Sequence, residues 1–599
     1  MYNPISNKIE ELSQSLGADD IVVKIAICSF ISFPLNAIMK RLPDRNYNLK
    51  CWYILFISSL YLFGILNNFS CFRSLFISSM ATYLISRFLS HSKLMPWINF
   101  LFVMTHLEIN HITLTDDTSS YITTGAQMVL VMKLTSFAWS YYDGQQNSNA
   151  STAKTLTPYQ KTKMIVRHPS PLEYLAYCFF YPSLLTGPSF DFVDFESWLH
   201  LEIFKDLPES KKPNKHWFGH QGKREIPKNG LLASRKIVES MIWLILFTYS
   251  DKFAPLAPVL ANNGKDFIKS HCFIYRIFYL WLLGFTFRFK YYSAWTIAEA
   301  SCILCGLGYN GYDAKTGKIK WNRVQNIDIK GFEFAQNTHV ALEAWNQNTN
   351  KWLKYYVYLR VSKPGSKPGF RSTLITFVTS ALWHGTKPGY YLTFITGAFY
   401  QTCGKLFRRN IRPVFMDKDG ITPLMPRKRI YDLISYIVTQ LAFGYMVQPF
   451  IVLNLNESLI IWSTVYYYID IGIIVTLFLF KGPYSKKFIK FLRSHSLQYK
   501  QAKNSNTVIN YSANMPISPD AINLGLPDLD ETSVAEVKKD FNEFKKEYNE
   551  WREKKGLEIE EDNLQKAFEK FRDEIKGHND KTEKRMSFSE YSPKPIKDD

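Results

Sequence analysis

A succession of long apolar runs, ending near residue 480, restricts what this chain can fold into more than any other feature. A helix needs about 20 mostly apolar residues to cross the hydrocarbon core of a bilayer. The candidate segments are 21–39, 51–68, 72–89, 97–113, 123–141, 171–188, 231–249, 271–289, 292–309, 340–361, 370–384, 388–406, 431–453 and 458–480. Several are short or interrupted, so some of them are expected to re-enter or to lie at the surface. The pattern predicts an all-α, polytopic membrane protein.

The positive charge of the chain is distributed as membrane insertion requires. Residues 1–500 carry 55 Lys and Arg against 30 Asp and Glu, whereas residues 501–599 carry 17 against 22. A nucleic-acid-binding protein would gather its positive charge on one soluble face, so no nucleic acid is expected as a partner. Here the charge lies in short loops between apolar runs, as the positive-inside rule expects of cytosolic loops. These loops are 40–50, 204–228, 403–430 and 481–503.

Changes in polarity divide the chain into four expected parts. Residues 1–20 are polar and lack the pattern of a cleaved signal peptide, so the first span is expected to act as the targeting signal. Residues 21–481 contain the spans. Residues 482–530 form a cytosolic basic segment and a linker rich in Asn, Ser and Pro. In residues 531–599, aromatic side chains recur at helical spacing among dense Lys and Glu, which predicts a cytosolic amphipathic helical tail.

The cysteines and glycines of one apolar segment do not predict a metal or nucleotide site. Cys302 and Cys305 form a single CxxC, and no second CxxC or His pair completes a zinc site. We expect two small residues on a buried helix. The glycines that follow, Gly306, Gly308 and Gly311, allow tight turns. They lack the strand–turn–helix context of a nucleotide-binding loop.

Polar side chains inside apolar segments are the most informative residues, because they are costly in a bilayer unless they are paired or line a cavity. His384 is the only titratable residue between Arg371 and Lys387, and the sequence GTKPG after it breaks the helix. Non-helical backbone at membrane depth is tolerated only against protein or a water-filled cavity. A histidine in a span is more often a hydrogen-bonded packing residue, but the break favours a catalytic interpretation.

A second polar group stands in WNQNTNKWLKYYVYLR, residues 345–360, which has the pattern of an amphipathic helix lined with aromatic residues. Asn346 and Asn348 lie near its start. Asparagine at such a position commonly caps a helix. The alternative is that one of them takes part in the chemistry.

Three further features bear on the interior of the membrane domain, and the first two have two interpretations each. Arg288 and Lys290 lie beside the tyrosine pair 291–292 at the edge of a span, where they either hold a phosphate or extend to the interface. Glu299 lies in an apolar stretch and has to be paired or face water. The segment 186–188, Thr-Gly-Pro, is expected to shape a helix break.

Five blocks of the sequence, in order, resemble the membrane-bound O-acyltransferase (MBOAT) family. A lone WHG would be a weak signal, but together the blocks are similar to the lysophospholipid branch of that family. They are AQMVLVMKLTSFAWSYYDG (126–144), YPSLLTGPSFDFVDF (181–195), RFKYYSAWTIAEASCILCGLGYNGYD (288–313), WNQNTNKWLK (345–354) and TSALWHGTKPGYYLTF (379–394).

The resemblance implies a helical MBOAT core with about eleven transmembrane helices in the endoplasmic reticulum membrane. It implies transfer of a fatty acyl group from acyl-CoA to the free sn-2 hydroxyl of a lysophospholipid, with no cofactor or metal beyond acyl-CoA as co-substrate. The catalytic histidine of the family falls on His384, and its partner asparagine falls on Asn346. The residues expected to contact substrate are Trp345, Lys354, Trp383, Gly385, Tyr291, Tyr292, Arg288, Glu299 and Thr186.

The chemistry agrees with this assignment. The acceptor hydroxyl is a poor nucleophile until a base takes its proton, and imidazole, with an unperturbed pKa of about 6.5, suits that role. The thioester is already activated, so direct transfer in a ternary complex is expected. Asn346 either donates to the developing oxyanion or orients the acceptor. We expect CoA to dock from the cytosol, the acyl chain to lie among aromatic residues and the lysolipid to enter sideways from the membrane.

Two alternative functions stay open at this point. An MBOAT can act on another acceptor, such as a sterol, diacylglycerol or protein. A transporter would also have many spans and polar residues within them, but the sequence shows neither an inverted repeat nor paired interrupted helices in corresponding halves.

Overall fold

The computed structural model describes residues 3–16, 19–44, 46–114, 118–146, 156–217, 220–362, 370–417 and 422–497. The chain divides into two units, Met1–Pro527 and Asp528–Asp599, and every described residue belongs to the first. The linker beyond residue 497 and the amphipathic tail expected over 531–599 therefore lie outside the described residues.

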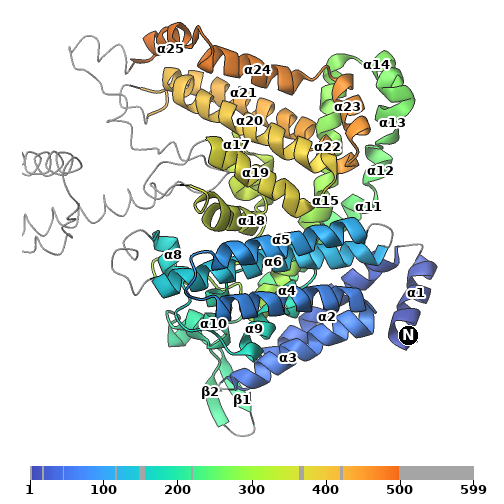
Figure 1. The fold of residues 1–599 in the computed structure, drawn as a ribbon, viewed down its shortest axis with the longest axis vertical. Coiled ribbons are helices and arrows are strands. Elements are labelled where there is room, and N and C mark those ends of the chain that lie inside the picture. Colours follow the sequence, from blue (N-terminus) through green and yellow to red (C-terminus); the bar gives the residue numbers. More distant parts are fainter. Residues whose placement is uncertain are drawn as a thin grey trace, which may run out of the picture. The chain divides into compact units, whose positions relative to one another are not determined.

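The first part of the chain is a bundle of long helices, which follow the apolar runs (Figure 1). Asp19, Asn46 and Asn68 cap three of these helices, because each side chain accepts a hydrogen bond from a free N–H of the first turn. Helix α6 packs against both α4 and α5, and this puts it at the centre of the bundle. The helices are α1 (Pro4–Leu16), α2 (Asp20–Met39), α3 (Tyr47–Ser59) with the π-helical turn η1 (Leu60–Ile65), α4 (Phe69–Phe88), α5 (Met95–Thr113) and α6 (Thr118–Gln146).

Short elements follow, and they correct one expectation. The segment 171–188 is not a span, because α9 ends at Cys178 and a proline-containing turn replaces it. Gly187 has a φ of +80° before Pro188, so the predicted break is present. The elements are α8 (Pro158–Lys163), α9 (Pro171–Cys178), η2 (Tyr181–Ser183), α10 (Phe192–Leu199), η3 (Glu202–Phe204), η4 (Glu209–Lys211) and the antiparallel hairpin of β1 (Asn214–Trp217) and β2 (His220–Lys223).

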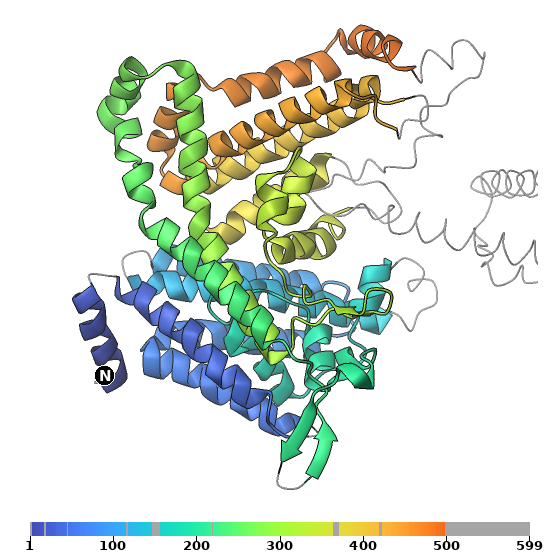
Figure 2. The same ribbon diagram turned by 180° about the vertical axis from the view of Figure 1, so that it is seen from behind.

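The next two expected spans, 271–289 and 292–309, are wrong as separate elements. They form one helix of 33 residues, α15 (Phe273–Cys305), because the polar side chains between them find partners and do not break it. Figure 2 shows α15 running beside α11 (Gly230–Thr248), and α15 also packs against α2 and α21 (Arg427–Met446). It therefore ties the first bundle to the last helices. Four short elements join α11 to α15: α12 (Ser250–Phe253), α13 (Ala257–Leu260), η5 (Ala261–Gly264) and α14 (Lys265–Ser270).

The expected span over 340–361 is also wrong, since the helix breaks inside it. The helix α17 (Thr338–Ala344) ends before Trp345, α18 (Gln347–Trp352) starts after Asn346, and the π-helical turn η6 (Leu353–Tyr358) follows. The short strands β3 (Tyr312–Asp313) and β4 (Lys318–Ile319) pair antiparallel before them, and α16 (Ile329–Glu333) precedes α17.

The last described part of the chain is again helical. A hairpin of α19 (Phe370–His384) and α20 (Pro388–Asn410) has Thr386, Lys387 and Pro388 exposed at its tip. The remaining elements are η7 (Arg412–Phe415), α21, α22 (Gln448–Val452), α23 (Leu455–Thr464), α24 (Tyr468–Lys481) and α25 (Ser485–Ser494).

Fewer helices than expected are apolar enough to cross a membrane on length and composition alone. Among the described residues, Asp20–Met39, Tyr47–Ile65 and Arg427–Val452 qualify, and α23 with α24, bent by 79°, makes a fourth candidate. The other long helices carry polar side chains that face neighbouring helices, such as Lys133 and Arg288, which lowers their hydropathy. Over the ranges that the structure describes, the fold is helical apart from two short hairpins, while the number of crossings, expected to be about eleven, is not established by these helices.

Large apolar side chains are exposed along several of these helices, and they indicate where lipid is in contact. Contiguous apolar surface on a protein marks an interaction face. The exposed residues include Val22, Ile31 and Ile38 on α2, Val238, Ile242 and Ile245 on α11, Leu433, Ile434 and Ile437 on α21, and Ile471, Ile474 and Phe478 on α24.

Candidate active site

His384 is the last residue of α19, and aromatic rings surround its imidazole. The ring centroids of Tyr390, Phe394 and Phe450 lie 5.5, 5.2 and 5.0 Å from that of His384. Within the described part of the chain, the imidazole has no hydrogen-bond partner. Among the described residues, His384 is therefore not the hydrogen-bonded packing residue that is commonest in a span, and both ring nitrogens can still donate or accept a hydrogen bond.

A second histidine, His111 of α5, stands against the end of α19. Its Nδ1 lies 3.3 Å from the position that a Cβ on Gly385 would take. Gly385 has a φ of +127°, a conformation that favours glycine and turns the chain sharply after His384. The imidazole of His111 therefore packs against the turn that presents His384.

Phe450 reaches His384 because α20 and α22 approach each other very closely. The N–H of Gly389 donates to the carbonyl of Leu453 at 3.0 Å. A Cβ on Gly389 would lie 2.0 Å from the carbonyl oxygen of Pro449, so only glycine fits here. This contact holds α22, with Phe450 on it, beside the first turn of α20.

Asn346 occupies the break between α17 and α18 in the left-handed conformation, with φ 44° and ψ 53°. Asparagine tolerates this region better than most residues, and a surrounding structure has to maintain it. The N–H of Gln347 donates to the carbonyl of Asn326 at 2.8 Å, and the Asn348 amide donates to the carbonyl of Val324 at 3.2 Å. These bonds fix the turn from outside.

The side chain of Asn346 does not cap the helix that follows it. Instead its Oδ1 accepts a hydrogen bond of 2.7 Å from the hydroxyl of Thr349. No partner for its Nδ2 lies among the residues that the structure describes. The capping interpretation is therefore wrong for Asn346, whereas Asn337 does cap α17.

Helix α6 holds both of these turns on one face. Trp383, next to His384, donates from Nε1 to the carbonyl of Met128 at 2.9 Å. Trp352, one turn after Thr349, donates from Nε1 to the hydroxyl of Thr135 at 2.8 Å. The two tryptophan rings are 5.9 Å apart between centroids. Residues 128 and 135 are seven apart, hence on one side of a helix, so α6 fixes the turns that carry His384 and Asn346 relative to each other.

Aromatic side chains continue from Asn346 toward His384. The ring of Trp345 lies 5.7 Å from that of Tyr291, and Tyr291 lies 5.8 Å from Phe287. Phe287 lies 6.5 Å from Phe450, which contacts His384. Tyr292 also packs against Trp345, at 6.1 Å. The structure thus brings together five residues expected at the site, namely Trp345, Tyr291, Tyr292, Trp383 and Gly385, around Asn346 and His384.

The other residues expected to bind substrate are Arg288, Glu299, Thr186 and Lys354. Two of them form ion pairs with other residues of the chain. Arg288 is buried and makes two bonds of 2.9 Å to Glu333, so it neither extends to the interface nor offers a free guanidinium to a phosphate. Glu299 is paired, as expected, with Lys236 at 3.0 Å. Thr186 lies in the turn after η2. Lys354 is buried in η6, with its Nζ 5.0 Å from the Tyr355 ring.

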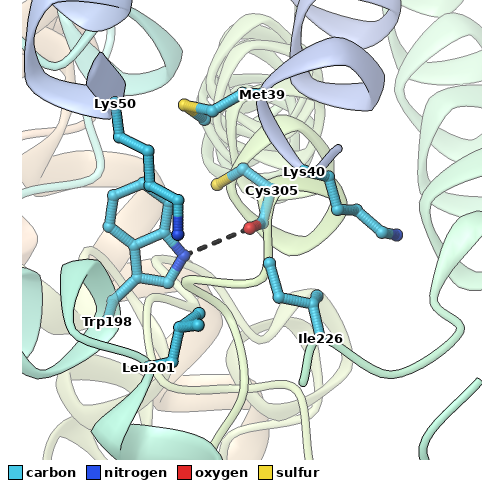
Figure 3. A pocket seen from close by; sticks show the side chains of 7 residues that line it. All are labelled: Met39, Lys40, Lys50, Trp198, Leu201, Ile226 and Cys305. Carbon is cyan, nitrogen blue, oxygen red and sulfur yellow. Dashed lines mark hydrogen bonds between the residues drawn. The ribbon is translucent and has the colours of Figure 1, made fainter. Parts of the chain in front are cut away.

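Two other features lie away from these turns. Cys302 and Cys305 are buried free thiols one turn apart on α15, as expected, and within the described ranges no three His, Cys, Asp or Glu side chains gather to hold a metal. Figure 3 shows a pocket between the ends of α2, α10 and α15, where Trp198 donates to the carbonyl of Cys305 at 3.1 Å. No residue expected to act on a substrate lines this pocket.

Several residues around His384 were not predicted from the sequence. His111 is a titratable residue inside the apolar segment 97–113, so the same rule that selected His384 could have found it. Gly389 lies in the GTKPG break that the sequence showed, but nothing in the sequence indicated its contact with α22, and Phe450 and Thr349 had no signal of this kind. Their importance comes from contacts between distant segments.

Comparison with known proteins identifies the family of this chain. The model of the MBOAT, membrane-bound O-acyltransferase, family matches residues 110–448, which include both Asn346 and His384. A lysophospholipid acyltransferase of Saccharomyces cerevisiae is 54% identical, covering 100% of this chain and 99% of its own length. A lysophospholipid acyltransferase of Schizosaccharomyces pombe is 39% identical over 82% of this chain and 92% of its own. Lysophospholipid acyltransferase 6 of Drosophila melanogaster is 32% identical over 70% and 53%.

Proposed function

We propose that this chain, which belongs to the membrane-bound O-acyltransferase family, is a lysophospholipid acyltransferase that uses acyl-CoA to esterify the sn-2 hydroxyl. The observation that carries the proposal is that α6 holds the turns of Asn346 and His384 together beside a row of aromatic rings. The names of the similar proteins support lysophospholipids as acceptors.

In the proposed reaction His384 is the general base. It takes the proton of the acceptor hydroxyl as the oxygen attacks the thioester carbonyl, and the carbonyl oxygen becomes an oxyanion. Asn346 Nδ2 is a hydrogen-bond donor for that oxygen. The C–S bond then breaks, His384 returns the proton to the leaving sulfur, and the products are a diacyl phospholipid and CoA. No cofactor is required beyond acyl-CoA as co-substrate.

The proposed setting is the endoplasmic reticulum membrane, with residues 21–481 as a catalytic domain of about eleven crossings and residues 482–530 and 531–599 in the cytosol. The 23 residues of α20 extend about 34 Å at the helical rise, enough to cross a core of about 30 Å. If α20 ends in the cytosol at its basic side, His384 lies toward the other face. The CoA headgroup is too polar to cross the bilayer core to that depth. A protein-lined tunnel therefore has to bring the thioester to His384.

The test is an assay of membranes that contain this protein, supplied with radiolabelled acyl-CoA and a panel of acceptors. We expect label in diacyl phospholipid when lysophospholipids are supplied, and we expect phospholipase A2 to release it. Label in a steryl ester, triacylglycerol or acylated peptide, with none in phospholipid, would contradict the proposal.

A further inference from the structure

The side chain of Thr349 faces Asn346, and this contact bears on how the asparagine works. Thr349 is buried on the first turn of α18, and its hydroxyl is 2.7 Å from Asn346 Oδ1 and 3.3 Å from Met132 Sδ. A hydroxyl has one proton to donate, and a thioether is a weak acceptor. The proton therefore goes to the amide oxygen.

The opposite orientation of the Asn346 amide is less favourable. With the amide turned over, Nδ2 would donate to Thr349, and the hydroxyl proton would have only the methionine sulfur. Among the described residues, the Thr349 hydroxyl has Asn346 Oδ1 and Met132 Sδ as its partners. Its one good acceptor is therefore Asn346 Oδ1.

We infer that Thr349 is a positioning residue that occupies the oxygen of the Asn346 amide and so presents Nδ2 as a hydrogen-bond donor to the reacting carbonyl. This rests on the proposed function and decides between the two roles that the sequence left open for Asn346. A donor without acceptor capacity stabilises an oxyanion, whereas orienting a hydroxyl by accepting its proton would need the oxygen that Thr349 occupies.

The left-handed backbone of Asn346 belongs to the same arrangement. It turns the side chain away from the N–H groups of α18, where an asparagine at this position ordinarily bonds. The Thr349 hydroxyl then replaces the backbone as the group that holds the amide. Without it, the amide is free to rotate and to present its oxygen to the substrate.

The experiment compares Thr349→Val with Thr349→Ser in purified enzyme. Valine keeps the shape but removes the proton, so we expect kcat to fall about 10- to 100-fold, as for a misplaced catalytic group, with KM for acyl-CoA unchanged. Serine keeps the hydroxyl and should restore most of the activity. Thr476→Val is the matched control, because the buried Thr476 hydroxyl donates to a backbone carbonyl, that of Gly472, and not to a residue expected at the substrate, and it should be neutral.

A further variant, Asn346→Asp, keeps an acceptor for Thr349 but removes the donor. We expect it to be as inactive as Asn346→Ala, whereas an Asn346 that acts through its oxygen would leave Asn346→Asp active. Near-normal kcat in Thr349→Val, or failure of serine to restore activity, would overturn the inference while leaving the proposed function standing. Absence of acyl transfer in the unmodified enzyme would instead remove the proposed function itself.

Discussion

At the scale of single residues, a buried polar group in this chain either stabilises the fold or is available to a substrate. The partners of the group distinguish the two cases. Arg288 and His384 both looked like candidates for chemistry from their sequence surroundings. Arg288 has a carboxylate and a tyrosine hydroxyl as partners. His384 has only ring contacts within the described part of the chain. A polar group without a protein partner is the one to expect at a substrate.

Arg288 is therefore predicted to act on stability and not on substrate affinity. Replacing it by methionine leaves the partly buried Glu333 carboxylate without its partner, and breaking a buried pair costs about 3–5 kcal/mol of unfolding free energy. Denaturant unfolding of the purified enzyme should show this loss, while KM for acyl-CoA stays the same. Lys290→Met is the control, because the Lys290 ammonium lies over the Phe287 ring, 3.7 Å from its centroid, and no described carboxylate pairs with it.

The opposite pattern, normal stability with a raised KM for acyl-CoA, would mean that Arg288 binds phosphate. A double variant, Arg288→Met with Glu333→Met, should recover much of the stability lost by the single one.

Much of the site could be predicted from the sequence, and the rest depended on folding. A polar residue in an apolar run has to be paired or line a cavity, and this rule identified His384 as a candidate. The resemblance to a family added Asn346. Thr349 could not be selected, because its importance comes from Asn346 and from Met132, 217 residues earlier in the chain. Phe450 could not be predicted either, because it contacts His384 only through the folding of distant segments.

At the scale of elements, apolar runs predicted where helices lie. The breaks that glycine and proline mark, at 186–188 and after His384, were also predicted, but breaks and continuities set by contacts with other segments were not. Residues 271–309 contain arginine, lysine and several tyrosines and looked like two spans, yet α15 is continuous. Residues 340–361 looked like one span, yet the chain breaks at Trp345 and Asn346. In both places the deciding interactions come from other segments: Glu333 bonds to Arg288, and the carbonyl of Asn326 holds Gln347.

The approach of α20 to α22 gives a prediction at this scale. Gly389→Ala places a methyl group 2.0 Å from the Pro449 carbonyl oxygen, so the two helices have to separate and Phe450 leaves His384. We expect a fall in kcat of at least about 10-fold together with a lower melting temperature. Gly397→Ala on the same helix is the matched control, because its nearest neighbour would be a ring carbon of Phe377 at 3.5 Å.

If Gly389→Ala had normal activity and stability, the close contact between α20 and α22 would not exist as described. Reduced stability with unchanged kcat would mean that Phe450 does not position His384.

At the scale of the whole molecule, the arrangement of the chain across the membrane follows from its charges. Basic residues flank α21 through α24 at both ends, in the loop after α20 and in α25, and the positive-inside rule places both on the cytosolic side. An epitope fused after Asp599 should therefore be cleaved by protease added to sealed microsomes. A lumenal marker protein serves as the control for sealing, and full protection of the epitope would reverse the proposed orientation.

The central claim, that His384 performs acyl transfer, is tested most directly by the rate of phospholipid formation in His384→Ala enzyme reconstituted into liposomes. General acid–base catalysis contributes on the order of 100- to 10,000-fold, so the account predicts a loss of at least about 100-fold in a protein that inserts and accumulates normally. His106→Ala, on α5 with its ring bonded to the Ser78 hydroxyl at 2.8 Å, should retain activity under the same conditions. A well-inserted His384→Ala enzyme with a rate close to that of His106→Ala would contradict the account.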